Sequence, residues 1–324
     1  LLVDYTSTIM EALRETTMAL SDDEVRWALD IKNATIRAAL ESDHLKELSD
    51  YEYAQYALIC RDNVEEALKR IDMMQHFREE YKIADNPDEG IELLLELTST
   101  QQPWFMVSVD YSPNHGHFIV VYDYARLNPA AVDLPEDWRV WLGGLYYIYQ
   151  LCQCNLMACR QGIVHIAECE GMWYSNFNTK FIVRNWHHLL EHYPLINKEC
   201  SWLHTPLVGN LQHAFFKSVM GPYADIIRVG CHFEGYDGRI DEMFKTPNED
   251  TAEQRLLARY LAYLRVRYHH QTVFRLPTSA PDPPAGPQAP IPAAADDNDD
   301  SNDEDEDMEG PQAPIPAAAD DNDE

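Results

Sequence analysis

Three cysteines and a histidine near the middle of the chain are of the types that bind metals. Cys152, Cys154 and Cys159 lie in a stretch that we expect to be helical, and His165 follows. Residues two apart on a helix point about 200° apart, so this spacing does not place the three sulfur atoms on one face. Zinc needs ligands that converge on one point. We therefore predict no metal site and interpret these cysteines as buried thiols.

Two other pairs have the residue types of catalytic groups. Cys200 and His204 have the types of a nucleophile and its base, but on a strand they lie about 13 Å apart, too far for proton transfer. Glu168 and Glu170 form a carboxylate pair at a strand end, yet no glycosidase context surrounds them, and we interpret them as solvated loop residues. No G-x-S-x-G motif is present. We predict no catalytic residue and expect the protein not to be an enzyme.

The charge of the chain excludes one large class of partner. Its 324 residues include 25 Lys and Arg against 55 Asp and Glu, a formal net charge of −30. Such a chain repels phosphate backbones, so we expect no nucleic-acid partner. The 7 cysteines include no C-x-x-C, which is typical of free thiols in a reducing compartment.

The apolar pattern alternates between helices and strands. Residues 5–82 read as helices, with Ser21 before one of them and Asn63, followed by Glu66 at the capping-box spacing, before another. Runs of β-forming residues predict strands at 105–109, 118–122, 162–167, 200–204 and 226–229. Further helices are expected at 141–159, 178–192, 209–220 and 252–268, the last one capped by Thr251. This order predicts an α/β fold, in which an N-terminal helical bundle packs on a domain with a mostly parallel sheet.

One predicted helix has the length of a membrane span. Residues 141–159 carry no formal charge, but they include Gln150, Gln153 and Asn155. We interpret this segment as a buried helix of a soluble domain.

Composition divides the chain into four parts. A helical N-terminal subdomain is expected at 1–85, an α/β domain at 88–235, a linker and helix at 236–276, and a disordered acidic tail at 277–324. The tail contains no Lys or Arg, and its segment 286–299 recurs as 310–323. Its Pro, Ala and Asp residues bury too little apolar surface to order a chain.

Several short motifs, taken in order, resemble one known family. They lie at 57–68, at 117–122 followed by Asn128 and Pro129, at 162–171, and at 193–195 before a strand that ends at 205–206. Over residues 50–235 this order is similar to that of the CRAL-TRIO lipid-binding family. The chain departs from the phosphatidylinositol-binding members at two positions, where it has Leu195 and Asp225. The resemblance therefore favours a ligand of low charge.

The resemblance implies a helical bundle beside an α/β domain with an apolar cavity, closed by a mobile helix near 211–220. The implied function is non-enzymatic binding and intermembrane transfer of a hydrophobic lipid, such as a tocopherol-like molecule, a retinoid, a sterol or a phospholipid. No cofactor other than the bound lipid is expected. The predicted cavity residues are Tyr147, Leu151, Phe177, Phe181, Ile182, Leu203, Leu211, Phe215, Phe216 and Val219.

Basic residues near the expected gate suggest contact with membranes. Lys180, Arg184, Lys217 and Arg228 are predicted to form a rim for membrane phosphates. We accordingly expect a cytoplasmic protein that is transiently at membranes. The alternative function is a lipid-sensing regulatory or scaffold module whose acidic tail recruits a protein partner. Finding a lipid that co-purifies with the chain would distinguish both of these lipid-binding functions from a scaffold that holds no ligand.

Overall fold

The computed structural model describes residues 19–41, 45–84, 86, 88–89, 92–93, 106–112, 117–124, 135–176, 192–230 and 249–280. All of them belong to the unit that spans Leu1–Pro281. Most of the acidic tail, residues 281–324, lies outside the described residues, so its disorder stays a prediction, as do the boundaries of the four parts.

The N-terminal layer consists of helices that begin at side-chain caps. Their bounds are Asp22–Ala39 for α2, Asp50–Cys60 for α3 and Val64–Glu80 for α4. Ser21 caps α2 in a capping box with Glu24, and Ser49 does the same for α3 with Glu52. Asn63 accepts from the Glu66 backbone at the start of α4. The cap predicted at Asn63 is therefore confirmed, because capping depends only on residues within one turn.

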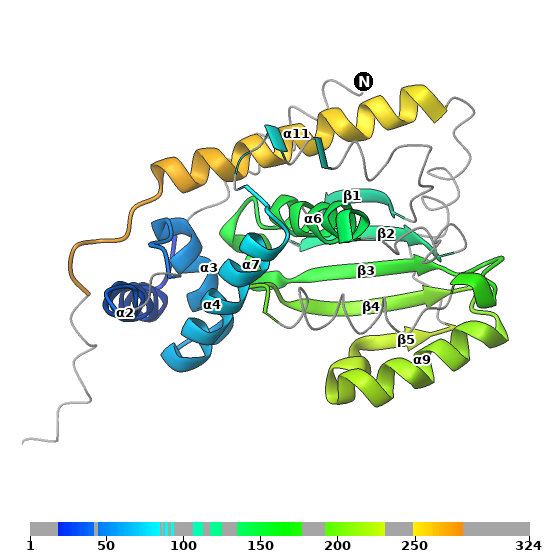
Figure 1. Cartoon of the computed structure of the whole chain (residues 1–324), viewed down its shortest axis with the longest axis horizontal. Helices are drawn as coiled ribbons and strands as arrows, with labels where there is room; N and C mark the ends of the chain where they lie inside the picture. The colour runs from blue at the N-terminus through cyan, green and yellow to red at the C-terminus, as the bar shows by residue number, and fades with distance from the viewer. Residues whose placement is uncertain are drawn as a thin grey trace, which may run out of the picture. The chain divides into compact units, whose positions relative to one another are not determined.

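The α/β part is built on a five-stranded sheet of order β1-β2-β3-β4-β5. The strands are β1 (Met106–Ser112), β2 (His117–Asp123), β3 (Ile163–Glu168), β4 (Asn197–Leu203) and β5 (Ile227–Val229). β1 pairs with β2 in antiparallel orientation, and β2 to β5 are parallel (Figure 1). The predicted α/β class with a mostly parallel sheet is confirmed.

The helix expected at 141–159 is interrupted. The structure has α6 (Pro135–Cys152), a break, and then α7 (Leu156–Gln161), which Asn155 caps by accepting from the Ala158 backbone at 2.7 Å. Two carbonyl groups in the break accept hydrogen bonds from other helices: Tyr51 Oη donates to the Gln153 carbonyl at 2.9 Å, and His270 Nδ1 donates to the Cys154 carbonyl at 2.6 Å. Among the described helices, none is both long enough and apolar enough to cross a bilayer.

Two further helices complete the fold. They are α9 (Leu207–Met220), which precedes a 3-10 turn at Gly221–Ile226, and α11 (Glu249–Val273). Since α11 begins before Thr251, the cap predicted at that residue is wrong. In Figure 1, α6 crosses one face of the sheet near β1 and β2, and α9 lies along β5.

Two apolar clusters hold these layers together. The larger one joins α4, α6 and α11 to the sheet, and in it the Tyr263 ring meets Phe118 edge-on with centroids 5.3 Å apart. The second joins α2, α3 and α4 to α7 and to the chain just after α11, where Phe274 and Leu276 are buried. The cysteines in these clusters are free and buried, as predicted: Cys60, Cys152, Cys154 and Cys159.

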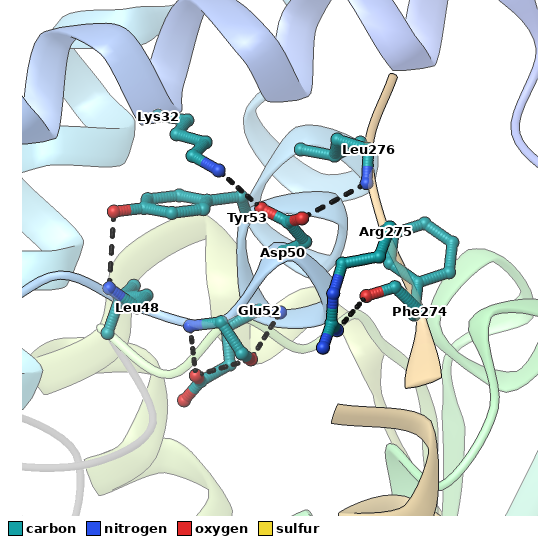
Figure 2. Close-up of polar contacts among 9 residues, drawn as sticks. Lys32, Leu48, Asp50, Glu52, Tyr53, Phe274, Arg275 and Leu276 are labelled. Atoms are coloured by element: carbon teal, nitrogen blue, oxygen red, sulfur yellow. Dashed lines mark hydrogen bonds and ion pairs between the residues drawn. The ribbon is translucent and has the colours of Figure 1, made fainter. Parts of the chain in front are cut away.

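The chain after α11 is fastened to the N-terminal layer, and we call residues 274–276 the C-terminal strap. Asp50 Oδ2 accepts from the Leu276 backbone at 3.1 Å, and its Oδ1 lies 2.7 Å from Lys32 Nζ (Figure 2). The Phe274 ring meets Tyr51 edge-on, with centroids 5.9 Å apart. One carboxylate therefore links α2, α3 and the strap.

We predict that Asp50→Ala destabilises the protein by about 1–3 kcal/mol, because it leaves Lys32 and the Leu276 amide without this acceptor. Urea unfolding of the full chain measures the change. The matched control is Asp72→Ala on α4, whose carboxylate faces His76 at 3.7 Å on the surface and should contribute less than about 0.5 kcal/mol. Equal losses from the two variants would contradict the prediction.

Candidate functional site

One face of the parallel sheet meets α6 and α9. Residues paired across parallel strands point to the same side, so the register defines this face. In the α6 half, the Tyr149 ring lies edge-on to His165 with centroids 6.4 Å apart. In the α9 half, the Phe216 ring lies edge-on to Trp202 at 5.7 Å. The face consists of Phe118, Val120, Tyr122, Ile163, His165, Ala167, Cys200, Trp202, Ile227 and Val229.

A polar network crosses this apolar face at its centre. His165 Nε2 lies 2.8 Å from Asn197 Oδ1, and His165 Nδ1 lies 3.1 Å from Tyr122 Oη. An amide oxygen only accepts, so Nε2 carries the proton and Nδ1 accepts from the tyrosine. Burial lowers the pKa of His165 to about 4, against a partial rise from the Asn197 hydrogen bond. Burial also raises the pKa of Tyr122 and Tyr149, so the network is neutral at physiological pH.

Three of the predicted cavity residues are buried. Tyr147 and Leu151 lie on α6 within the larger apolar cluster, where the Tyr147 hydroxyl donates to the Ala84 carbonyl. Leu203 is buried at the end of β4. Its register with Glu168 places it on the face opposite the one defined above.

The other described cavity candidates lie on α9. Phe215 and Phe216 are half-buried against the larger cluster, and Val219 packs beside Trp202 in a third cluster. Leu211 lies instead on the solvent side of the helix. Phe177, Phe181 and Ile182 lie outside the described residues, so their role stays a prediction.

The two described members of the predicted basic rim are both close to carboxylates. Lys217 Nζ lies 3.8 Å from Asp225 Oδ1, and Arg228 Nη1 lies 3.5 Å from Glu199 Oε1. Their positive charges are therefore partly compensated on the surface. Lys180 and Arg184 lie outside the described residues.

An exposed apolar edge forms where β3 and β4 end. Met172, after β3, and Val208, in the first turn of α9, belong to one apolar cluster. The ends of β3 and β4 lie at the same side of the sheet (Figure 1). The exposed fractions are 65% for Trp173, 56% for Tyr174, 73% for Leu207 and 53% for Leu211. We call these four residues the apolar edge.

A carboxylate–histidine group adjoins this edge. Glu168 Oε2 lies 2.9 Å from His204 Nδ1, and Glu168 Oε1 accepts from the Glu170 backbone at 2.9 Å. One ligand atom from each residue lies within 4.8 Å of the others, the spacing of metal ligands. The hydrogen bonds within the group account for this proximity. In the part of the chain that the structure describes, Cys152, Cys154 and Cys159 form no such group with His165.

The last helix holds a buried arginine that the sequence analysis did not single out. The Arg267 side chain is only 1% exposed and lines a small cavity with Gln150 and Gln153. The apolar edge was also missed. The adjacent Trp173 and Tyr174, placed just after a strand-ending turn, were the available signal.

Comparisons with known proteins do not identify this chain. No protein-family model matches it, and a search of curated proteins finds no match.

The buried His165 makes stability depend on pH. Its folded pKa of about 4 lies below the ordinary value of 6.5, so between these values the unfolded chain binds a proton that the folded chain does not. We therefore predict that stability falls by up to about 3 kcal/mol as the pH falls from about 6.5 to 4. Urea unfolding at pH 7 and pH 4.5 measures this loss.

The His165→Gln variant separates this histidine from the other titrating groups. Its loss of stability between the two pH values should be clearly smaller than that of the unmodified chain. In His76→Gln, which alters a half-exposed histidine on α4, the full loss should remain. The same loss in His165→Gln as in the unmodified chain would rule out His165 as its source.

Proposed function

We propose that this protein binds a hydrophobic lipid in a CRAL-TRIO-like α/β domain and exchanges it at a membrane surface. The parallel sheet, with an apolar face under α6 and α9, supports this function. A lipid gains about 0.8 kcal/mol for each CH₂ group removed from water, which makes such a face a suitable contact surface.

The observation that carries the proposal is the apolar edge. Trp173 and Tyr174 after β3, and Leu207 and Leu211 after β4, expose large apolar side chains, and exposed apolar patches mark interaction sites. Trp and Tyr have an apolar body and a polar tip, which suits them to the interface between lipid and water. Membrane contact at this edge removes these side chains from water.

The helix α9 is the proposed gate, because it joins the apolar edge to the sheet. Its first turn carries Leu207 of the edge, and its later residue Phe216 covers the fully buried Trp202. A ligand therefore reaches Trp202 only when α9 moves away. Insertion of Leu207 and Leu211 into a membrane would stabilise that outward position.

The chemistry of the sheet face favours a ligand without charge. Its polar groups are the neutral His165 and the Tyr122 hydroxyl, which already bond to each other. A buried charged headgroup at this face would need a compensating charge. The proposed ligand is therefore mostly apolar, with at most a neutral polar end.

The charges near the apolar edge favour uncharged membrane surfaces. Glu168 and Glu170 lie beside the edge, and Lys217 is close to Asp225. Anionic headgroups would be repelled by these carboxylates. The apolar contacts are thus proposed to supply most of the membrane affinity.

The double variant Leu207→Glu with Leu211→Glu tests the proposal. Sedimentation with phosphatidylcholine vesicles should show membrane affinity reduced about tenfold or more, because burial of one leucine is worth about 1.5–3 kcal/mol. In parallel, mass spectrometry of an organic extract of the purified full chain should find a stoichiometric lipid.

The matched control is Leu40→Glu, which adds charge at a leucine that is even more exposed but lies at the end of α2. It should leave vesicle binding unchanged. The proposal fails if the double variant binds vesicles as well as the control does, or if the extract contains no lipid.

A further inference from the structure

A glutamine interrupts the apolar side of α9. Positions three or four apart on this helix lie on one side of it, and here they are Val208, Gln212, Phe216 and Val219. The three apolar members belong to the cluster around Trp202. Gln212, in the middle of the row, is only 2% exposed. An amide therefore occupies a position that an apolar side chain would suit better.

The amide oxygen of Gln212 is unsatisfied in the closed position of α9. No residue in the described part of the chain donates a hydrogen bond to its Oε1, and this atom has almost no accessible surface, so solvent does not reach it. A buried acceptor in this state has lost the hydrogen bonds that water gives it elsewhere. The contact between α9 and the sheet includes this cost.

The sheet side of the same contact has unsatisfied groups as well. Trp202 of β4 is fully buried, and its ring centroid lies 6.1 Å from that of His213 and 5.7 Å from that of Phe216. Within the described ranges, neither Trp202 Nε1 nor His213 Nε2 has a hydrogen-bond partner, and both atoms are closed to solvent. Buried polar groups in folded proteins are mostly paired, so three unpaired atoms at one contact call for an explanation.

The place of α9 in the fold allows it to move by itself. It lies along β5, which is only three residues long and is the last strand of the described sheet (Figure 1). The side of α9 that carries Leu207 and Leu211 is exposed. Departure of α9 would therefore leave the pairing of β2, β3 and β4 intact.

We infer that the unsatisfied groups at this contact are a release device, through which α9 detaches from the sheet while the rest of the fold remains. Detachment lets water bond to Gln212, Trp202 and His213, which offsets part of the cost of exposing the apolar side. An apolar residue at position 212 would remove this offset and hold the helix closed. The inference rests on the proposed function for the role of α9 as a gate, whereas the detachment itself needs no lipid.

Native-state hydrogen exchange of the full chain without lipid tests the device. A detached helix of 14 residues is marginal in water, so its amides exchange whenever α9 leaves the sheet. The amides of α9 should exchange faster than those of β3. The variant Gln212→Met, which keeps an unbranched side chain, should slow exchange in α9 about tenfold or more and leave β3 unchanged.

The matched control is Gln75→Met on α4, which removes a buried amide that is satisfied. Gln75 Oε1 accepts from the Lys46 backbone at 2.7 Å, and Gln75 Nε2 donates to the Lys46 carbonyl at 2.9 Å. This variant should not slow exchange in α9. The inference is overturned if α9 exchanges no faster than β3, or if a folded Gln212→Met protein exchanges its α9 amides as fast as the unmodified chain.

Transfer of lipid between phosphatidylcholine vesicles separates this inference from the proposed function. If α9 is the gate, the Gln212→Met variant should transfer lipid more slowly than the unmodified chain. Slower exchange in α9 with unchanged transfer would support the release device and contradict the gate.

Discussion

The parallel pairing of β2, β3 and β4 is the constraint on which the rest of the structure depends. The connection between two neighbouring parallel strands must cross over the sheet, and parallel strands end on the same side. The ends of β3 and β4 therefore lie at one edge of the sheet. Trp173 and Leu207, which follow these two ends, therefore belong to the same edge although they are far apart in sequence. The same register places His165 beside Tyr122 on one face, so the neutral polar network and the apolar edge have a common origin.

The interruption between α6 and α7 has a structural role of its own. A continuous helix would use the carbonyl groups of Gln153 and Cys154 internally. The break releases them to accept from Tyr51 and Gln55 on α3 and from His270 on α11. These bonds attach the helical layer to the α/β layer at one place, next to a small cavity that Gln55, Gln153 and Arg267 line.

Local features were the ones that the sequence could predict. The strand near 118–122 follows from a dense run of β-forming residues, and the cap at Asn63 depends on one helical turn. The break at 153–155 could not be predicted, because its hydrogen-bond partners come from segments about a hundred residues away. The burial of Arg267 could not be predicted for a similar reason, because it depends on residues of several helices that meet around it. For the candidate site, the sequence predicted a set of apolar residues on α6 and α9. It did not predict the apolar edge, which we propose contacts the membrane.

The C-terminal strap resists tension less than the central sheet does. A pull on the chain beyond Leu276 acts first on a single backbone hydrogen bond to Asp50 and on the buried Phe274 ring. These contacts break one after another, whereas the ladder between β2 and β3 spans six residue pairs. Tension at this end would therefore detach the strap from α3 while the sheet stays intact.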